Sequence, residues 1–240
     1  MVLRVFCDFD GTVCREDVGN KLFRTFAGEH RAIEIVKDYL EDRIGARECL
    51  TREVEAVDDL SEAALDDFIA QFKLDPAFSR FVDFCKARSI PLTILSDGLD
   101  AYVEKILAEN GHRDVRFAAN HAEFVRDHSK TKLRVSFPHT DAECDQCGNC
   151  KRNHMITQSG DDDVIVYVGD GISDRCPVRY ADIVFAKRQL IKYCQQQNIT
   201  HHVFDTFADV QSRLEDVLRR KRIKHRREAV MARREVFLQG

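Results

Sequence analysis

The sequence predicts an α/β fold in which a parallel sheet is covered by helices on both faces and a helical cap is inserted. Three short apolar runs, at residues 2–6, 92–95 and 164–168, predict buried strands. Between them lie segments whose apolar residues recur at helical spacing. Strands that alternate with helices are typical of a Rossmann-like parallel sheet buried on both faces.

Length and composition fit one core domain with an insertion. The chain has 240 residues, of which 44% are hydrophobic and 32% charged, as in globular proteins. It has no apolar run long enough to span a membrane and no signal-peptide pattern at its start, so we expect a cytoplasmic protein without a membrane partner. The sequence does not indicate an oligomeric state.

The elements follow one another in an order that divides the chain. Residues 1–14 carry the first strand and its polar end, and residues 15–87 read as consecutive helices with breaks near Gly28, Gly45, Ser61 and Pro76. We expect 15–87 to be the cap and 88–218 to complete the core. Within the core, 112–150 reads as a small β insertion with a cysteine-rich loop, and 219–240 is a basic tail.

Each predicted strand ends in polar residues. The first ends in FCDFDGTV, which contains Asp8 and Asp10, the second in the turn Ser96-Asp97-Gly98, and the third in Gly169-Asp170-Gly171. Two acids so close together repel each other unless a cation lies between them. Because ligands of parallel sheets bind beyond the carboxyl ends of the strands, we expect these turns to converge on one site.

This residue set suits phosphate chemistry. Asp8 and Asp170 can share a Mg²⁺ ion, which prefers oxygen ligands. Asp8 can attack phosphorus to form an aspartyl-phosphate, while Asp10 protonates the leaving alcohol and later deprotonates water. The turn at Ser96 can hydrogen-bond phosphate oxygens, and Lys151 at a helix start adds positive charge.

The order of DFDGT, a strand ending in Ser96, a lysine and GDGISD resembles that of the haloacid dehalogenase superfamily phosphatases. The long helical cap between the first two motifs is similar to that of the phosphoserine-phosphatase-like branch. The resemblance implies a magnesium-dependent phosphatase acting on a small phosphorylated metabolite. It implies these roles: Asp8 as nucleophile and metal ligand, Asp10 as acid/base and as ligand through its carbonyl, Ser96 and Lys151 as phosphate binders, Asp170 as metal ligand, and Asp174 in the outer shell.

The substrate is less well defined. The segment 148–199 resembles the methionine-salvage phosphatase that acts on 2-hydroxy-3-keto-5-methylthiopentenyl 1-phosphate. Phosphatases of phosphoethanolamine or phosphocholine, of thiamine monophosphate and of phosphoserine remain alternatives, as does a phosphotransferase or mutase. Glu16 and Asp17 lie where this branch often places substrate-facing residues, although Asp17 reads equally well as a helix cap.

Two segments stand outside the motif pattern. Cys144, Cys147 and Cys150 have CxxCxxC spacing, which predicts either a structural Zn²⁺ site beside Lys151, reduced thiols in a tight loop, or a disulfide formed on isolation. In the tail, seven of the nine residues 219–227 are Lys or Arg. The rest of the chain, before position 219, is acidic, with 28 basic and 39 acidic residues. We expect a solvated helical extension, because the acidic body disfavours nucleic acid as a partner.

Overall fold

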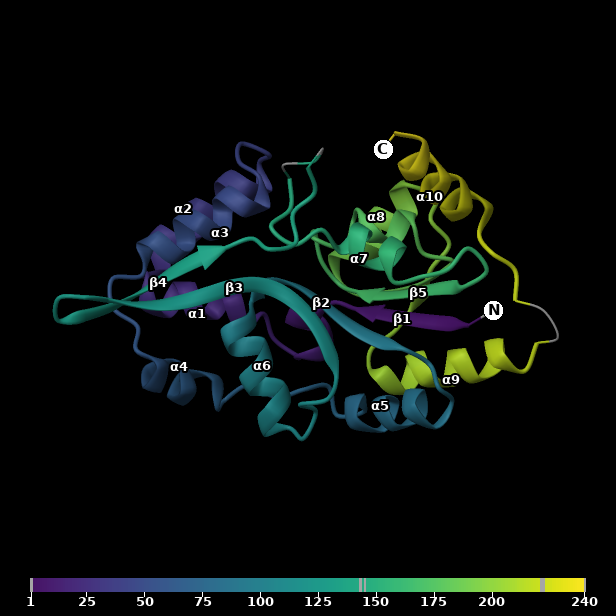
Figure 1. Ribbon diagram of the computed structural model, residues 1–240, viewed down its shortest axis with the longest axis horizontal. Helices are drawn as coiled ribbons and strands as arrows, with labels where there is room; N and C mark the ends of the chain where they lie inside the picture. The colour runs from purple at the N-terminus through teal and green to yellow at the C-terminus, as the bar shows by residue number, and fades with distance from the viewer. Residues whose placement is uncertain (1, 143, 145, 221–222, 240) are drawn as a thin grey trace. The chain divides into compact units, whose positions relative to one another are not determined.

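The structure is a computed structural model that describes residues 2–142, 144, 146–220 and 223–239 (Figure 1). The chain forms two compact units. The first consists of Met1–Val13, Leu74–Leu95 and Lys151–Gly240, and the second of Cys14–Lys73 and Ser96–Cys150. The cap and core boundaries expected from the sequence remain a prediction.

The first unit is built on parallel strands. The central strand β1 (Leu3–Cys7) pairs with β2 (Leu92–Leu99) and with β5 (Val164–Gly169), so that Val5 lies opposite both Leu92 and Val166. Strands β6 (Ile183–Ala186) and β7 (His202–Val203) continue the sheet in parallel. All six residues of β5 are buried, as its high content of valine and isoleucine predicts for a strand covered on both faces.

A hairpin extends the strand order at one end. Strands β3 (Arg116–Asp127) and β4 (Lys130–Ser136) pair antiparallel, and the full order is β4-β3-β2-β1-β5-β6-β7. The predicted α/β class is therefore confirmed. The sequence indicated short β elements at 115–138 but gave no sign that they form one long antiparallel pair.

Helices cover both faces of the first unit's sheet. In Figure 1, α5 (Phe78–Ala87) and α9 (Phe207–Leu218) lie on one side of β1 and β5, and α7 (Lys151–Thr157) and α10 (Arg227–Gln239) on the other. Helix α8 (Gln189–Gln196) follows β6 and contacts it. Thr206 and Asp209 form a capping box at the start of α9, which fixes where this helix begins.

The second unit contains the remaining helices. These are α1 (Val18–Phe26), α2 (Glu29–Leu40), α3 (Ala46–Ala56), α4 (Glu62–Ile69) and α6 (Asp100–Glu109). The predicted breaks at Gly28, Gly45 and Ser61 are the residues that immediately precede α2, α3 and α4. The Ser61 hydroxyl accepts a hydrogen bond from the backbone of Ala64, as expected for a capping residue. Within the described residues, every helix is too short or too polar to cross a bilayer.

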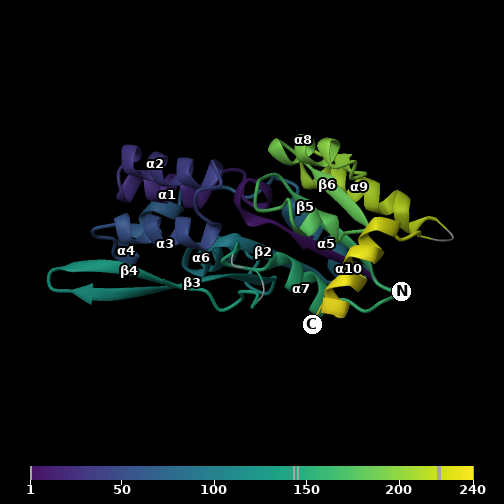
Figure 2. The same ribbon diagram turned by 90° about the horizontal axis from the view of Figure 1, so that it is seen from above.

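The C-terminal segment differs from the sequence expectation. We predicted a solvated extension, but α10 packs within the first unit, and Ala229 is fully buried. Figure 2 shows α10 beside α7. The reason is a buried acidic partner, Asp182, which lies more than forty residues earlier in the chain and binds arginines of this segment.

Candidate active site at the ends of β1 and β5

The first acidic turn follows β1 directly. Asp8 is buried, and its backbone N–H donates to the carbonyl of Val168 at 2.9 Å, which ties it to the end of β5. The chain then turns at Gly11, whose φ of +73° is in the left-handed region. A Cβ atom at Gly11 would lie 2.4 Å from Oδ2 of Asp170. Glycine is therefore required here both for backbone conformation and for space.

The second acidic turn is shaped by Asp174. Its Oδ2 accepts hydrogen bonds from the backbone N–H groups of Asp170 (2.8 Å) and Gly171 (3.0 Å). Its Oδ1 accepts a hydrogen bond from the Tyr167 hydroxyl at 2.6 Å. A Cβ atom at Gly169 would lie 2.4 Å from Oδ2 of Asp174, so this position also needs glycine. Asp174 thus folds the turn that carries Asp170.

The two turns bring three carboxylates together. Asp8, Asp170 and Asp174 each offer an oxygen atom, and these atoms lie within 4.8 Å of one another. This confirms that the acidic turns at the ends of β1 and β5 converge. Buried carboxylate oxygens are the donors that Mg²⁺ prefers, so the residues fit the metal expected from the sequence.

Lys151 supplies the positive charge inside this cluster. Its Nζ lies 2.6 Å from Oδ1 of Asp8 and 2.9 Å from Oδ1 of Asp174, and it also donates to the Ser173 hydroxyl at 2.9 Å. Burial, and then the charge of Asp174, raise the pKa of Asp8, while Lys151 opposes this shift. Burial and Asp174 raise the pKa of Asp170 as well. The cluster therefore carries more carboxylate than Lys151 can neutralise, and a divalent cation would stabilise its ionised form.

Three further side chains contribute that sequence reasoning missed. The Thr12 hydroxyl donates to Oδ1 of Asp170 at 3.3 Å, and Arg188 Nη1 lies 2.9 Å from Oδ2 of the same residue. The third is Tyr167, described above. Thr12 belongs to the DFDGT motif and could have been found there. Tyr167 sits within an apolar strand, and nothing in the local sequence around Arg188 indicates its partner.

The remaining predicted site residues include Asp10, Ser96, Asp17 and Glu16. Asp10 is half-buried in the turn after β1. In the second unit, the Ser96 hydroxyl accepts a hydrogen bond from the backbone of Gly98 at 3.0 Å. The predicted turn at Ser96-Asp97-Gly98 is wrong, because β2 continues through these residues to Leu99. Asp17 caps α1 by accepting from the backbone of Asn20, and exposed Glu16 pairs with Lys21.

The end of the cysteine loop, at Asn149 and Cys150, is held by hydrogen bonds. Asn149 is fully buried, and its side-chain amide donates to the carbonyls of Ser96 (2.7 Å) and Ala118 (2.9 Å). The backbone of Cys150 donates to the carbonyl of His139 at 2.7 Å. These bonds fix the chain immediately before Lys151.

The proposed zinc site is not supported. Within the described residues, the three loop cysteines are not part of a converging group of metal ligands, in contrast to the three aspartates. The nine cysteines all lie in the described part of the chain and form no disulfide. The hydrogen bonds at Asn149 and Cys150 order the end of this loop.

Comparison with known proteins agrees with this geometry. The model of the haloacid dehalogenase-like hydrolase family matches residues 5–177. The 2-hydroxy-3-keto-5-methylthiopentenyl-1-phosphate phosphatase of Geobacillus thermodenitrificans is 34% identical over 221 residues, which cover 89% of this chain and 96% of that protein. The protein of the same name from Exiguobacterium sibiricum is 31% identical over 218 residues, covering 90% and 97%.

The fold also agrees with solved structures. A phospho-aspartyl intermediate analogue of phosphoserine phosphatase superposes with a TM-score of 0.66 at 16% identity, covering 88% of this chain and 98% of that one. The family match spans both acidic turns and Lys151, the residues that converge in the first unit. The chain belongs to the haloacid dehalogenase-like hydrolase family and is a phosphatase with the phosphoserine-phosphatase-like fold.

Proposed function

We propose that this phosphatase hydrolyses a small phosphomonoester through an aspartyl-phosphate formed on Asp8. The observation that carries the proposal is the buried cluster in which Asp8, Asp170 and Asp174 offer oxygens within 4.8 Å of one another. Asp8 and Asp170 would hold Mg²⁺ through carboxylate oxygens, and Asp10 through its backbone carbonyl. When bound, the ion would neutralise charge on the transferring phosphoryl group.

The protein's residues would perform the reaction in two steps. A carboxylate oxygen of Asp8 attacks phosphorus as the bond to the ester oxygen breaks, and Asp10 gives its proton to the departing alcohol. Asp10 then takes a proton from water, which attacks the same phosphorus. The bond to Asp8 breaks and inorganic phosphate leaves. Lys151 keeps Asp8 ionised and oriented, since its Nζ is 2.6 Å from Oδ1.

We retain Ser96 and Gly98 as the phosphate-binding residues that the sequence predicts. The Ser96 hydroxyl and the Gly98 backbone N–H are hydrogen-bonding groups that suit phosphate oxygens. Asn149 supports this end of β2 by donating to the Ser96 carbonyl. For the remainder of the substrate we retain Glu16 and Asp17 as candidate contacts. The Asp97 carboxylate also accepts a hydrogen bond from the backbone of Asn149, at 3.3 Å, which adds to the order of this end of β2.

For the substrate, we propose 2-hydroxy-3-keto-5-methylthiopentenyl 1-phosphate. Support comes from relatives of that name that are 31% and 34% identical and align over 90% and 89% of this chain. The test is a panel of phosphate esters assayed with Mg²⁺: this enol phosphate, phosphoethanolamine, phosphocholine, thiamine monophosphate, phosphoserine, a phosphosugar and a nucleotide. We expect the enol phosphate to have the highest kcat/KM, and a phosphosugar or nucleotide in first place would contradict the assignment.

The nucleophile is tested with Asp8→Asn. The amide has nearly the same shape but is neither nucleophilic nor a good ligand, so we expect a loss of at least about a thousandfold in kcat. Intact protein, checked by thermal unfolding, is the control for folding. Substantial activity in freshly purified variant would show that Asp8 does not form the covalent bond. Transfer of phosphate to an added alcohol instead of water would favour a phosphotransferase.

A further inference from the structure

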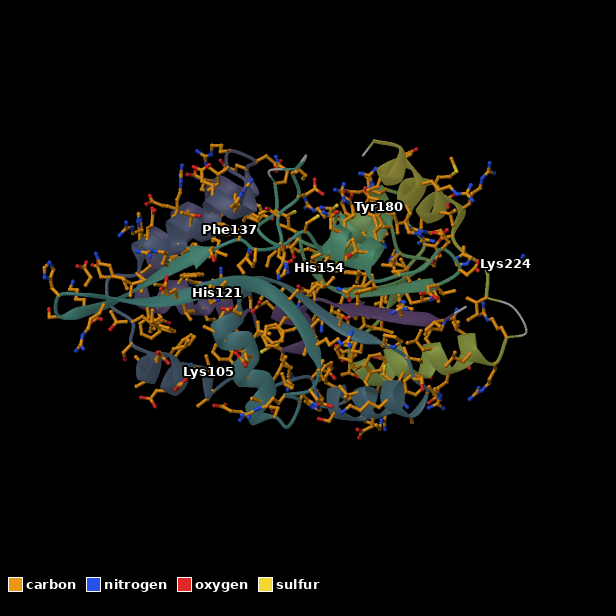
Figure 3. The ribbon with its side chains drawn as sticks, viewed as in Figure 1. Lys105, His121, Phe137, His154, Tyr180 and Lys224 are labelled. Atoms are coloured by element: carbon orange, nitrogen blue, oxygen red, sulfur yellow. The ribbon has the colours of Figure 1, made fainter. Side chains whose placement is uncertain are left out.

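The C-terminal segment that precedes and includes α10 is bonded to the turn that follows the GDGISD motif. Arg226 Nη2 donates to the carbonyls of Val178 and Arg179, both at 2.7 Å. Arg233 Nη1 donates to the carbonyl of Tyr180 at 2.6 Å. Two arginines thus bind three consecutive carbonyls. Figure 3 labels Tyr180 in this turn and Lys224 near the start of the segment.

A buried carboxylate anchors the same arginines. The Asp182 side chain is fully withdrawn from solvent and lies 3.2 Å from Arg233 Nη1 and 3.3 Å from His225 Nδ1. It also accepts from the backbone of Arg226 at 3.1 Å and of Ile165, the second residue of β5, at 3.0 Å. A buried charge requires such compensation. Asp182 therefore joins the C-terminal segment to β5, the strand that Asp170 follows.

The turn at residues 178–180 is hydrogen-bonded directly to Asp174, a member of the acidic cluster. The backbone N–H of Val178, whose carbonyl binds Arg226, donates to the carbonyl of Asp174 at 3.2 Å. The Asp174 side chain in turn binds Lys151 and the backbone of Asp170. Hydrogen bonds, joined through the covalent frames of Val178 and Asp174, therefore connect Arg226 to the groups that surround Asp8.

We propose that Arg226 and Arg233 are positioning residues that hold the Asp170–Asp174 turn in the conformation that binds the metal ion. The proposal rests on the proposed function, because it assigns Asp170 to that ion. Arginine suits the task because its planar guanidinium can donate to two carbonyls at once, which a lysine ammonium does less well. The basic C-terminal segment thus belongs to the working enzyme.

The test compares Arg226→Met with a matched control, Arg227→Met. Both changes remove one positive charge from adjacent positions, but the Arg227 side chain is exposed. Three quantities are measured well below the unfolding temperature: Mg²⁺ affinity by calorimetry, amide hydrogen exchange over residues 170–180, and kcat and KM. We expect Arg226→Met to weaken Mg²⁺ binding about two- to thirtyfold, to speed exchange in this turn and to lower kcat. Arg227→Met should match wild type.

The remaining variants separate positioning from general stability. Arg226→Lys should recover part of the Mg²⁺ affinity because its ammonium group restores the charge and N–H donors without the planar fork, and Arg233→Met should repeat the defect more weakly. If Arg226→Met lowers only the unfolding temperature, with Mg²⁺ affinity and exchange equal to the control, the proposal is wrong. Failure of the proposed function looks different: Asp8→Asn would remain active, whereas the affinity and exchange measurements would still decide the role of Arg226.

Discussion

The ammonium group of Lys151 lies 2.6 Å from the carboxylate of Asp8, with only 2% and 7% of the two side chains exposed. A second carboxylate, Asp174, lies 2.9 Å from the same ammonium. Burial raises the pKa of Asp8, and Lys151 works against that shift. The ion pair is therefore what favours a charged, reactive Asp8 in a site that otherwise favours its protonated form.

Replacing Lys151 with methionine should damage both activity and stability. Two carboxylates would lose their shared cation while remaining buried, and removing one partner of a buried ion pair typically costs about 3–5 kcal/mol. Urea unfolding without Mg²⁺ measures the loss, with Lys192→Met, an exposed residue of α8, as control. Equal unfolding free energies for the two variants would mean that Lys151 does not hold the cluster together.

Asp10→Asn should distinguish good from poor leaving groups. An alkyl alcohol needs a proton as it departs, whereas a phenolate leaves without one, so the variant should be slowed most with alkyl phosphates. We expect roughly a hundredfold or greater loss in kcat/KM with an alkyl ester and a much smaller loss with an aryl ester. Equal slowing of both esters would argue against Asp10 as the general acid.

Metal removal should show a requirement for magnesium alone. The converging ligands are carboxylates, and within the described residues no cysteine joins them. Treatment with a chelator followed by dialysis should abolish turnover, and Mg²⁺ alone should restore it fully. Activity that returns only after Zn²⁺ is also added would reinstate the cysteine site.

Glu53 should make stability depend on pH. Burial, and then the charge of Asp17, raise the pKa of this α3 residue from 4.5 to about 8. The folded state therefore binds the proton more tightly, so the stabilisation is full below about pH 4.5 and is lost as the pH rises to about 8. As the pH rises from 5.5 to 8.5, the unfolding temperature of Glu53→Gln should fall less than that of wild type. Exposed Glu55→Gln is the control and should follow wild type.

The sequence predicts the centre of the site because its geometry follows from strand order. Asp8 and Asp170 each follow an apolar strand. Because β1 and β5 are neighbouring parallel strands, their carboxyl ends lie at the same edge of the sheet. The glycines beside them mark turns in which a Cβ atom has no room, as Gly11 and Gly169 show. At these positions the local sequence pattern is therefore enough to predict where the side chains lie in the fold.

Residues that act through distant partners escape this reasoning. Tyr167 reads as one more apolar position in β5, although its hydroxyl binds Asp174. Arg226 reads as part of a charged run that favours solvent, and its backbone and Asp182, 44 positions away, become partners only in the folded chain. For the same reason the cysteine spacing predicted a metal site, whereas the converging ligands among the described residues are Asp8, Asp170 and Asp174. Local sequence shows that a side chain is charged or polar, but it does not show which distant residue that side chain binds in the folded protein.

The placement of β1 has a consequence for how the protein is made. Asp8 leaves the ribosome early, yet Lys151 follows it by 143 residues, and Thr12 finds Asp170 only 158 residues later. A growing chain must therefore carry its future nucleophile through most of translation without the surrounding groups that order it. Closing such long loops is slow compared with forming the local helices of residues 18–69. Truncated or stalled chains should then be helical but inert, and exposed to proteolysis at their N-terminal strand.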